Sequence, residues 1–233
     1  MQRLLAVVAL MGVLGPWQSN AQTPATRTVE VSGRIIILEK DNKPSPDLGD
    51  AVLYLEALPA AATSAVARPI TVEIAITDKT YAPHVMVVPV GSSVRFPNHD
   101  PFNHNVFSLS EPNEFDLGLY GRGEAKSETF AYPGLVRVYC NVHPRMVAYV
   151  QVMANRYYVQ PGADGSFTVA NVPPGSYRLH VWHERIPAEV VTDITAGSGE
   201  PLEITLDARG YRLQAHRNKY GKNYPTNAGQ ERY

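Results

Sequence analysis

The segment with the clearest chemistry is Val138–Met146, which reads Val-Tyr-Cys-Asn-Val-His-Pro-Arg-Met. It contains the only cysteine of the chain, Cys140, followed at intervals of three residues by His143 and Met146. A thiolate, two imidazoles and a weak axial thioether are the ligands of a blue-copper electron-transfer site. This loop offers three of those four groups. His104, in the upstream sequence Asn-His-Asn-Val-Phe, is placed to supply the second imidazole.

The N-terminus has the features of a signal peptide for export, which we assign to residues 1–21. Arg3 gives a positive start, Leu4–Leu14 is an apolar run too short to span a bilayer, and small residues precede a cleavage position after Ala21. No later stretch is predicted to cross or anchor in a membrane, so we expect a soluble periplasmic protein. A single cysteine cannot form an internal disulfide there, and metal ligation would account for its presence.

The mature chain is predicted to be all-β, because short apolar runs alternate with Gly, Pro, Asn and Asp. Residues 70–153 form one compact unit in this prediction. Side chains of a strand alternate between its two faces, so Cys140 and Met146 are each expected on the apolar face of their strand. The residues that share those faces are Val136, Val138, Ala148, Val150 and Val152.

Strands are also predicted on both sides of this unit, two before it and several after it. We interpret them as one small sandwich, residues 28–58 with 155–208, that residues 70–153 interrupt. An N-terminal hairpin that simply extends the 70–153 unit is the alternative.

At the metal-binding residues the chain resembles the cupredoxins, and most closely their amicyanin and plastocyanin branch. The Cys-x-x-His-x-x-Met spacing is similar to the short amicyanin loop, and His104-Asn105-Val106 matches the motif of the first histidine. The resemblance implies a Greek-key β-sandwich that holds one type 1 copper ion through His104, Cys140, His143 and Met146. It also favours His104 over His99, which lies five positions earlier.

The resemblance further implies how these residues divide the work. His104 should be buried, His143 should lie near the surface where electrons enter or leave, and Met146 should be the axial ligand. Asn105 and Asn141 are candidates for hydrogen bonds that hold the loop or reach the sulfur, or they are ordinary turn residues.

A second resemblance concerns the C-terminal part of the chain. Asp164-Gly165-Ser166-Phe167 and Val172-Pro173-Pro174-Gly175-Ser176-Tyr177 are similar to carboxypeptidase-regulatory or transthyretin-like domains. These domains begin with strands that Gly33-Arg34 and residues 51–55 could supply. The expected fold is therefore a cupredoxin Greek-key sandwich with a second, transthyretin-like sandwich. His180 and His183 fall on opposite faces of a strand there, so we interpret them as ordinary strand and loop residues.

Charge says little about partners, since the formal net charge is −1. We expect no nucleic-acid binding. The basic residues of the C-terminal stretch 209–233 stand out, because Glu231 is the only acidic residue there. We interpret this stretch as a basic flexible tail, with a docking arm for an acidic partner as the alternative.

The predicted function is a periplasmic type 1 copper electron-transfer protein that cycles between Cu(II) and Cu(I) and exchanges electrons with redox partner proteins. We do not expect an enzyme, because the sequence shows neither His-x-His clusters nor a second copper-binding unit. A periplasmic copper-binding or chaperone protein is one alternative. A scaffold protein with structural copper is the other.

Overall fold

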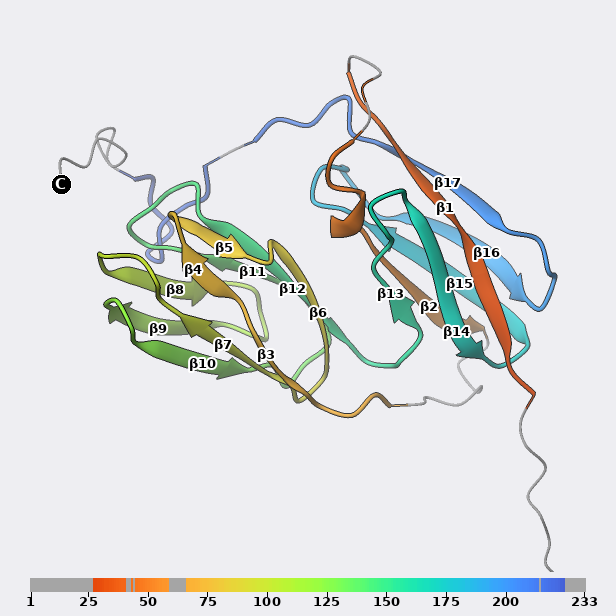
Figure 1. Cartoon of the computed structure of the whole chain (residues 1–233), viewed down its shortest axis with the longest axis horizontal. Coiled ribbons are helices and arrows are strands. Elements are labelled where there is room, and N and C mark those ends of the chain that lie inside the picture. Colours follow the sequence, from red (N-terminus) through yellow and green to blue (C-terminus); the bar gives the residue numbers. More distant parts are fainter. Residues whose placement is uncertain (1–26, 41–42, 44, 59–65, 214, 225–233) are drawn as a thin grey trace, which may run out of the picture.

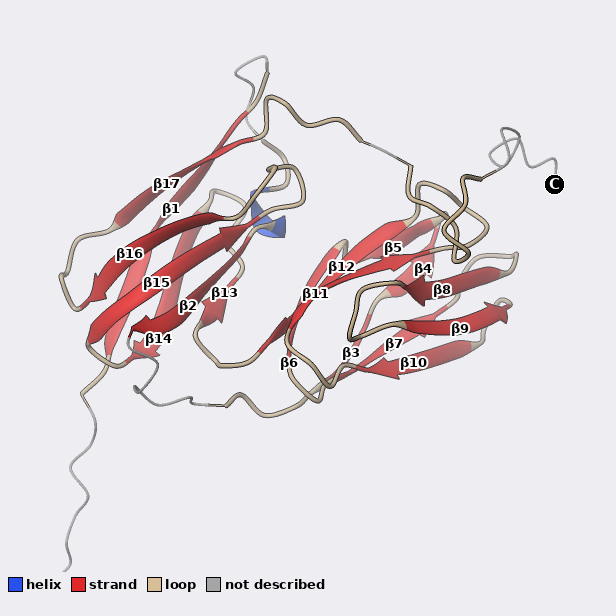
Figure 2. Cartoon of the chain, turned by 180° about the vertical axis from the view of Figure 1, so that it is seen from behind, coloured by secondary structure: helices blue, strands red, loops and turns tan. Residues whose placement is uncertain are grey.

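The computed structural model describes residues 27–40, 43, 45–58, 66–213 and 215–224, and strands dominate them. Apart from one short 3-10 helix, η1 (Leu48–Asp50), every regular element in these ranges is a β-strand. Figure 1 shows two sandwiches, one yellow and green and the other orange, teal and blue, and Figure 2 shows them from behind. The prediction of an all-β fold is confirmed. The predicted signal peptide lies outside the described residues.

The first sandwich contains the strands between residues 71 and 153. Its larger sheet has the order β6-β12-β11-β8-β9, its smaller sheet has the order β10-β7-β3, and β4 and β5 form a separate hairpin. Because β7 and β8 lie in different sheets, the chain crosses between the sheets just before His104. The strands are β3 (Thr71–Glu73), β4 (Ala75–Thr77), β5 (Thr80–Ala82), β6 (Val85–Pro89), β7 (Ser93–Pro97), β8 (His104–Ser108), β9 (Phe115–Tyr120), β10 (Ala125–Thr129), β11 (Gly134–Tyr139) and β12 (Val147–Met153).

The core of this sandwich extends to the ends of β11 and β12. Val138 pairs with Ala148 across the two strands, and both side chains are buried. Cys140 directly follows β11, Met146 directly precedes β12, and both belong to the same apolar cluster. The alternation predicted from the sequence therefore carries both sulfur-bearing side chains into the core.

The second sandwich is built from strands on both sides of the first in the sequence. Its sheets have the orders β14-β1-β17 and β13-β2-β15-β16. Among the described strands, none between residues 71 and 153 joins them. The strands are β1 (Val29–Leu38), β2 (Val52–Leu58), β13 (Tyr158–Val159), β14 (Ser166–Val172), β15 (Gly175–Trp182), β16 (Val190–Ala196) and β17 (Leu202–Asp207). That the two units behave as separate domains with the predicted boundaries stays a prediction.

Gly33 in β1 marks a close approach between neighbouring strands. β17 runs parallel to β1, with Leu202 opposite Gly33. A Cβ at Gly33 would clash with the carbonyl oxygen of Leu202. The glycine that interrupts this apolar strand in the sequence is therefore required by the pairing of β1 with β17.

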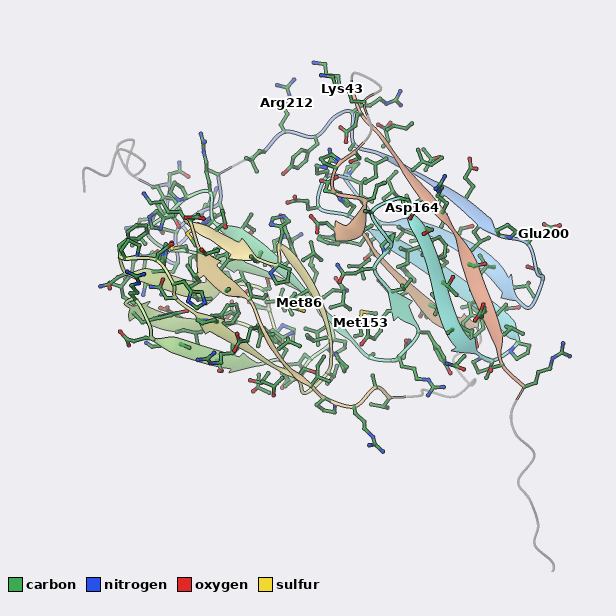
Figure 3. The ribbon with its side chains drawn as sticks, viewed as in Figure 1. Lys43, Met86, Met153, Asp164, Glu200 and Arg212 are labelled. Atoms are coloured by element: carbon green, nitrogen blue, oxygen red, sulfur yellow. The ribbon has the colours of Figure 1, made fainter. Side chains whose placement is uncertain are left out.

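The two sandwiches meet through an apolar contact between β2 and β15 on one side and the β6-β12-β11 sheet on the other. Val52, Val85 and Trp182 form its buried centre. The rings of Tyr149 and Trp182 lie 5.1 Å apart. Figure 3 labels Met86 and Met153 near this boundary.

An ion pair lies beside the apolar contact. The Nε2 atom of His84 is 2.9 Å from Oε1 of Glu184. Burial lowers the pKa of His84, but the hydrogen bond and charge of Glu184 and the charge of Asp50 outweigh burial and raise this pKa above its usual value. Burial raises the pKa of Glu184, but the hydrogen bond and charge of His84 bring it below the usual value. At mildly acidic pH, His84 is therefore protonated and Glu184 is ionised.

We predict that Glu184→Gln destabilises the protein in a pH-dependent way. Because the pKa of His84 is raised in the folded state, the ion pair contributes its full share to the free energy of unfolding below the unfolded-state pKa of about 6.5. This share is lost as pH rises through the folded-state pKa of His84. Urea unfolding should show a loss of about 1 kcal/mol at pH 6 that shrinks at pH 9. Glu203→Gln, an exposed change on β17, is the control. An equal loss at both pH values would contradict the role of the charge.

Candidate metal centre

Three buried side chains from separate positions in the sequence converge at one end of the first sandwich. His104 opens β8, Cys140 follows β11, and His143 lies in the loop between β11 and β12. The Sγ atom of Cys140 is 3.7 Å from Nδ1 of His104 and 3.6 Å from Nδ1 of His143. The ligand atoms of all three residues lie within 4.8 Å of one another. Among the described residues this is the one group of its kind.

The spacing of these atoms fits a shared metal ion. In well-characterised zinc sites the metal–imidazole bond is about 2.0–2.1 Å and the metal–thiolate bond about 2.3 Å, so an angle of about 110–120° separates nitrogen from sulfur by about 3.6–3.8 Å. Both sulfur–nitrogen distances here, 3.7 and 3.6 Å, lie in that range. One thiolate and two imidazoles also form a donor set suited to copper rather than to Mg²⁺ or Ca²⁺.

Met146 closes the loop that carries two of these ligands. Its N–H donates to the carbonyl oxygen of His143 at 3.1 Å, and its own carbonyl oxygen accepts the N–H of Cys140 at 3.4 Å. Its side chain is 2% exposed. The loop is therefore a tight turn between paired strand ends. The axial role of the Met146 thioether stays a prediction.

The two histidines differ in exposure. His104 is fully buried, whereas His143 is 8% exposed. The half-buried ring of Phe102 lies beside both, with centroid distances of 5.2 Å to His104 and 5.9 Å to His143. His143, the histidine expected nearer the surface, is therefore the more exposed of the two.

Asp100, which the sequence analysis did not identify, holds the ring of His104. Nε2 of His104 lies 2.8 Å from Oδ2 of Asp100, so that nitrogen donates to the carboxylate. Nδ1 of the same ring is thereby left on the side of Cys140. A carboxylate that accepts from the outer nitrogen of a histidine fixes its tautomer and orientation for metal binding. His99, the competing ligand in the sequence, is exposed and outside the cluster.

The hairpin of β4 and β5 fixes Asp100 in turn. Asp78 and Lys79 at its tip have φ values of 51° and 57°. Their N–H groups donate to the Asp100 carboxylate at 2.7 and 2.9 Å. Burial raises the pKa of Asp100, but the hydrogen bonds from Lys79, His104 and Asp78 outweigh it and hold the pKa below its usual range. The carboxylate stays charged at neutral pH.

Tyr81 joins the backbones beside two ligands. Its buried hydroxyl group lies 3.1 Å from the carbonyl oxygen of Asn105 and 3.1 Å from that of Tyr139. Asn105 follows His104, and Tyr139 precedes Cys140. The hydroxyl group therefore ties the segment that carries His104 to the segment that carries Cys140.

The side chains of the two asparagines considered in the sequence analysis both make hydrogen bonds beside the candidate ligands. Nδ2 of Asn105 donates to Oδ1 of Asp116 at 2.7 Å. Oδ1 of Asn141 accepts the N–H of Lys219 at 3.0 Å. Lys219 belongs to the C-terminal segment, which was not expected to contact this site.

The other histidines of interest serve the second sandwich. His180 stacks on Tyr54 with a centroid distance of 4.6 Å and lies between Glu56 and Glu189. His183 is buried, its Nε2 donates to the carbonyl oxygen of Asp47, and its Nδ1 accepts from Arg185. Neither joins a metal-binding group among the residues with described positions.

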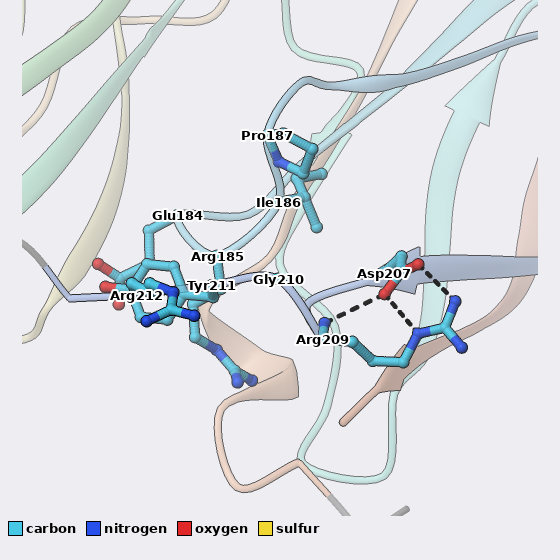
Figure 4. Close-up of a pocket in the computed structure, with 9 residues that line it drawn as sticks. All are labelled: Glu184, Arg185, Ile186, Pro187, Asp207, Arg209, Gly210, Tyr211 and Arg212. Carbon is cyan, nitrogen blue, oxygen red and sulfur yellow. Dashed lines mark hydrogen bonds and ion pairs between the residues drawn. The ribbon is translucent and has the colours of Figure 1, made fainter. Parts of the chain in front are cut away.

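A pocket of 490 Å³ on the second sandwich contains none of the candidate ligands. Figure 4 shows the ion pair of Asp207 and Arg209 at one side of this pocket. Nη2 of Arg209 lies 2.7 Å from Oδ2 of Asp207. The residues that line it are Glu184, Arg185, Ile186, Pro187, Asp207, Arg209, Gly210, Tyr211 and Arg212.

One family model matches part of the chain. It is described as polysaccharide lyase family 4, domain II, and it matches residues 139–202. The match starts at the end of β11 and stops at the start of β17, so it includes parts of both sandwiches. It covers less than half of the chain and does not show a family. No curated protein matches the chain.

Similar solved structures include a cupredoxin, a copper-containing nitrite reductase and an amicyanin. A purple cupredoxin from Nitrosopumilus maritimus is 26% identical, with a TM-score of 0.32, over 35% of this chain and 99% of that one. A copper-containing nitrite reductase from Thermus scotoductus SA-01 is 27% identical, with a TM-score of 0.35, over 41% of this chain and 26% of that one. Amicyanin from Paracoccus versutus is 21% identical, with a TM-score of 0.32, over 42% of this chain and 91% of that one.

These similarities span less than half of the chain at low TM-scores, so the function proposed below rests on the site itself. The predicted likeness of the second sandwich to carboxypeptidase-regulatory or transthyretin-like domains stays a prediction.

We predict that Asp100→Asn weakens metal binding without unfolding the protein. The amide removes the negative charge that the outer nitrogen of His104 faces, and loss of such a partner lowers metal affinity about 10- to 100-fold. Competition with a copper chelator measures the affinity, and circular dichroism checks the fold. Asp207→Asn, which removes a carboxylate from an exposed ion pair in the second sandwich, is the matched control. An unchanged affinity in folded Asp100→Asn protein would contradict this role.

Proposed function

We propose that the protein is a copper electron carrier with one type 1 centre. The observation that carries this proposal is the convergence of a buried thiol and two buried imidazoles, with sulfur–nitrogen distances of 3.7 and 3.6 Å. Bound copper would supply a one-electron exchange between Cu(II) and Cu(I). The two oxidation states favour different geometries, so a carrier works best when its ligands move little between them.

The residues around the site are arranged to keep the ligands in place. Asp100 fixes the ring of His104, and the Tyr81 hydroxyl joins the two ligand-bearing segments. Cys140 directly follows the last paired residue of β11, and this pairing limits the movement of its side chain. Burial of all three ligands excludes water from most of the site. Under this proposal the slightly exposed edge of His143 is where electrons enter or leave.

We also propose that the carrier is exported to the periplasm and exchanges electrons with partner proteins rather than acting as an enzyme. The signal-like features of residues 1–21 support export. Among the described residues the structure contains no helix with the length and apolar character needed to span a bilayer.

Copper handling is the main competing function. A chaperone usually presents an open site rich in thiols or thioethers. Val150 in β12 pairs with Met86, and Met153 ends the same strand. At about 3.3 Å per residue, Val150 and Met153 lie well along β12 from Met146, so the other two methionines with described positions do not gather at the ligands. This arrangement favours a carrier over a chaperone.

The absorption spectrum of the copper-loaded protein tests the proposal. We expect an intense thiolate-to-copper band in the visible range, which disappears with ascorbate and returns on reoxidation. Cys140→Ser should abolish the band, because the hydroxyl group cannot replace the thiolate. His99→Ala, an exposed change near the site, should leave it unchanged.

Absence of the band in folded, copper-loaded protein would rule out the carrier and leave copper handling. A band that does not respond reversibly to reduction would instead favour structural copper in a scaffold protein. In that case the binding of a partner should survive Cys140→Ser.

A further inference from the structure

The C-terminal segment His216–Tyr224 lies against the first sandwich, although the chain reaches it from β17 of the second. Figure 1 shows the blue chain crossing from one sandwich to the other before it ends. The sequence predicted a basic flexible tail for residues 209–233. In the structure this part of the tail makes hydrogen bonds and ring contacts around the ligand loop. Residues 225–233 lie outside the described part of the chain.

Two hydrogen bonds connect the segment to the loop that carries the thiolate. The hydroxyl group of Tyr224 donates to the carbonyl oxygen of Cys140 at 2.7 Å. The N–H of Lys219 donates to Oδ1 of Asn141 at 3.0 Å. The segment thus holds the backbone of one ligand and the side chain of its neighbour.

Through Asp116 in β9, the same segment is also linked to β8, the strand that carries the first histidine. Nζ of Lys219 lies 2.7 Å from Oδ2 of Asp116. The other oxygen of that carboxylate accepts from Nδ2 of Asn105, the residue after His104. Lys219 therefore connects to both ligand-bearing segments, through Asn141 on one side and through Asp116 and Asn105 on the other.

A stacked pair of rings completes the contact. The ring of His216 lies 4.2 Å from that of Tyr139, with an angle of 19° between their planes. Tyr139 precedes Cys140, and its backbone carbonyl already accepts from the Tyr81 hydroxyl. The strand end before the thiolate is consequently held from the interior by Tyr81 and from the outside by His216.

We infer that His216–Tyr224 is a strap that positions the ligand loop, with Tyr224 and Lys219 as its positioning residues. Hydrogen bonds to the loop from outside the first sandwich resist opening of residues 140–146, whether or not metal is bound. In a copper carrier such a strap would limit ligand movement between oxidation states. Only the copper measurement below rests on the proposed function.

Hydrogen exchange in the metal-free protein tests the strap directly. Tyr224→Phe removes the hydroxyl group that bonds to Cys140 and keeps the ring. We expect the backbone amides of residues 140–143 and 145–147 to exchange about two- to tenfold faster, the change expected for the loss of one hydrogen bond. Tyr220→Phe, at a tyrosine of the same segment that is 71% exposed, is the matched control and should change nothing. Equal exchange in the two variants would overturn the inference.

Lys219→Met provides a second variant that keeps a long side chain and removes the ion pair with Asp116. It should also speed exchange of residues 140–147 while leaving β2 and β15 of the second sandwich unchanged. Faster exchange confined to the loop supports the strap. Equally faster exchange throughout the chain in both variants would show general destabilisation and count against it.

The reduction potential of copper-loaded protein gives a readout that a purely structural role would not move. The hydroxyl dipole of Tyr224 points its proton at the backbone of Cys140 and so favours the more negative, reduced state of the site. Tyr224→Phe should therefore lower the potential, and Tyr220→Phe should not. An unchanged potential in Tyr224→Phe would overturn the positioning role of this residue at the copper site. The absence of any copper chromophore in the unaltered protein would count against the proposed function alone.

Discussion

The pairing of β11 with β12 determines where the candidate ligands lie. The N–H of Cys140 bonds to the carbonyl oxygen of Met146, one step beyond the last strand pair, Tyr139 with Val147. Because side chains alternate along a strand, this register turns Cys140 toward the core, and a shift by one residue would turn it to the opposite face. The tight loop then brings His143 to within 3.6 Å of the sulfur.

The second requirement is that His104 reaches the same point from another part of the chain. It stands where the chain, having crossed between the sheets, enters β8. Asp100 in that crossing fixes the ring, and the hairpin tip at Asp78 and Lys79 fixes Asp100. The site thus depends on several short hydrogen bonds among polar groups that would be costly to bury alone. These bonds suit a site whose ligands must move little.

The sequence was sufficient for the features that depend on local pattern. Short apolar runs between turn residues predicted the all-β fold, and alternation along β11 and β12 predicted the inward direction of Cys140. The spacing in the loop and the upstream histidine motif identified the three side chains that the structure brings together. The role of Asp100 could not be predicted in the same way. Its carboxylate is defined by contacts with a hairpin 21 and 22 residues earlier and with His104 four residues later. No period or spacing encodes such contacts.

The C-terminal segment shows the same limit from another direction. Its lysines and arginines, read in sequence, indicate a solvated tail, but Lys219 finds Asp116 103 residues away and Tyr224 finds Cys140 84 residues away. Only the folded chain brings these groups together. At the Asp164-Gly165 turn and at Gly33, in contrast, the turn and the close strand approach restrict residue type locally.

X-ray absorption at the copper edge, on protein loaded with one equivalent of copper, tests most directly whether Cys140, His104 and His143 share one ion. The account predicts one sulfur scatterer and two imidazole nitrogens in the nearest coordination sphere, with the sulfur lost in Cys140→Ser and one imidazole lost in His104→Ala. A coordination sphere of oxygen and nitrogen alone in the unaltered, folded protein would contradict the central claim.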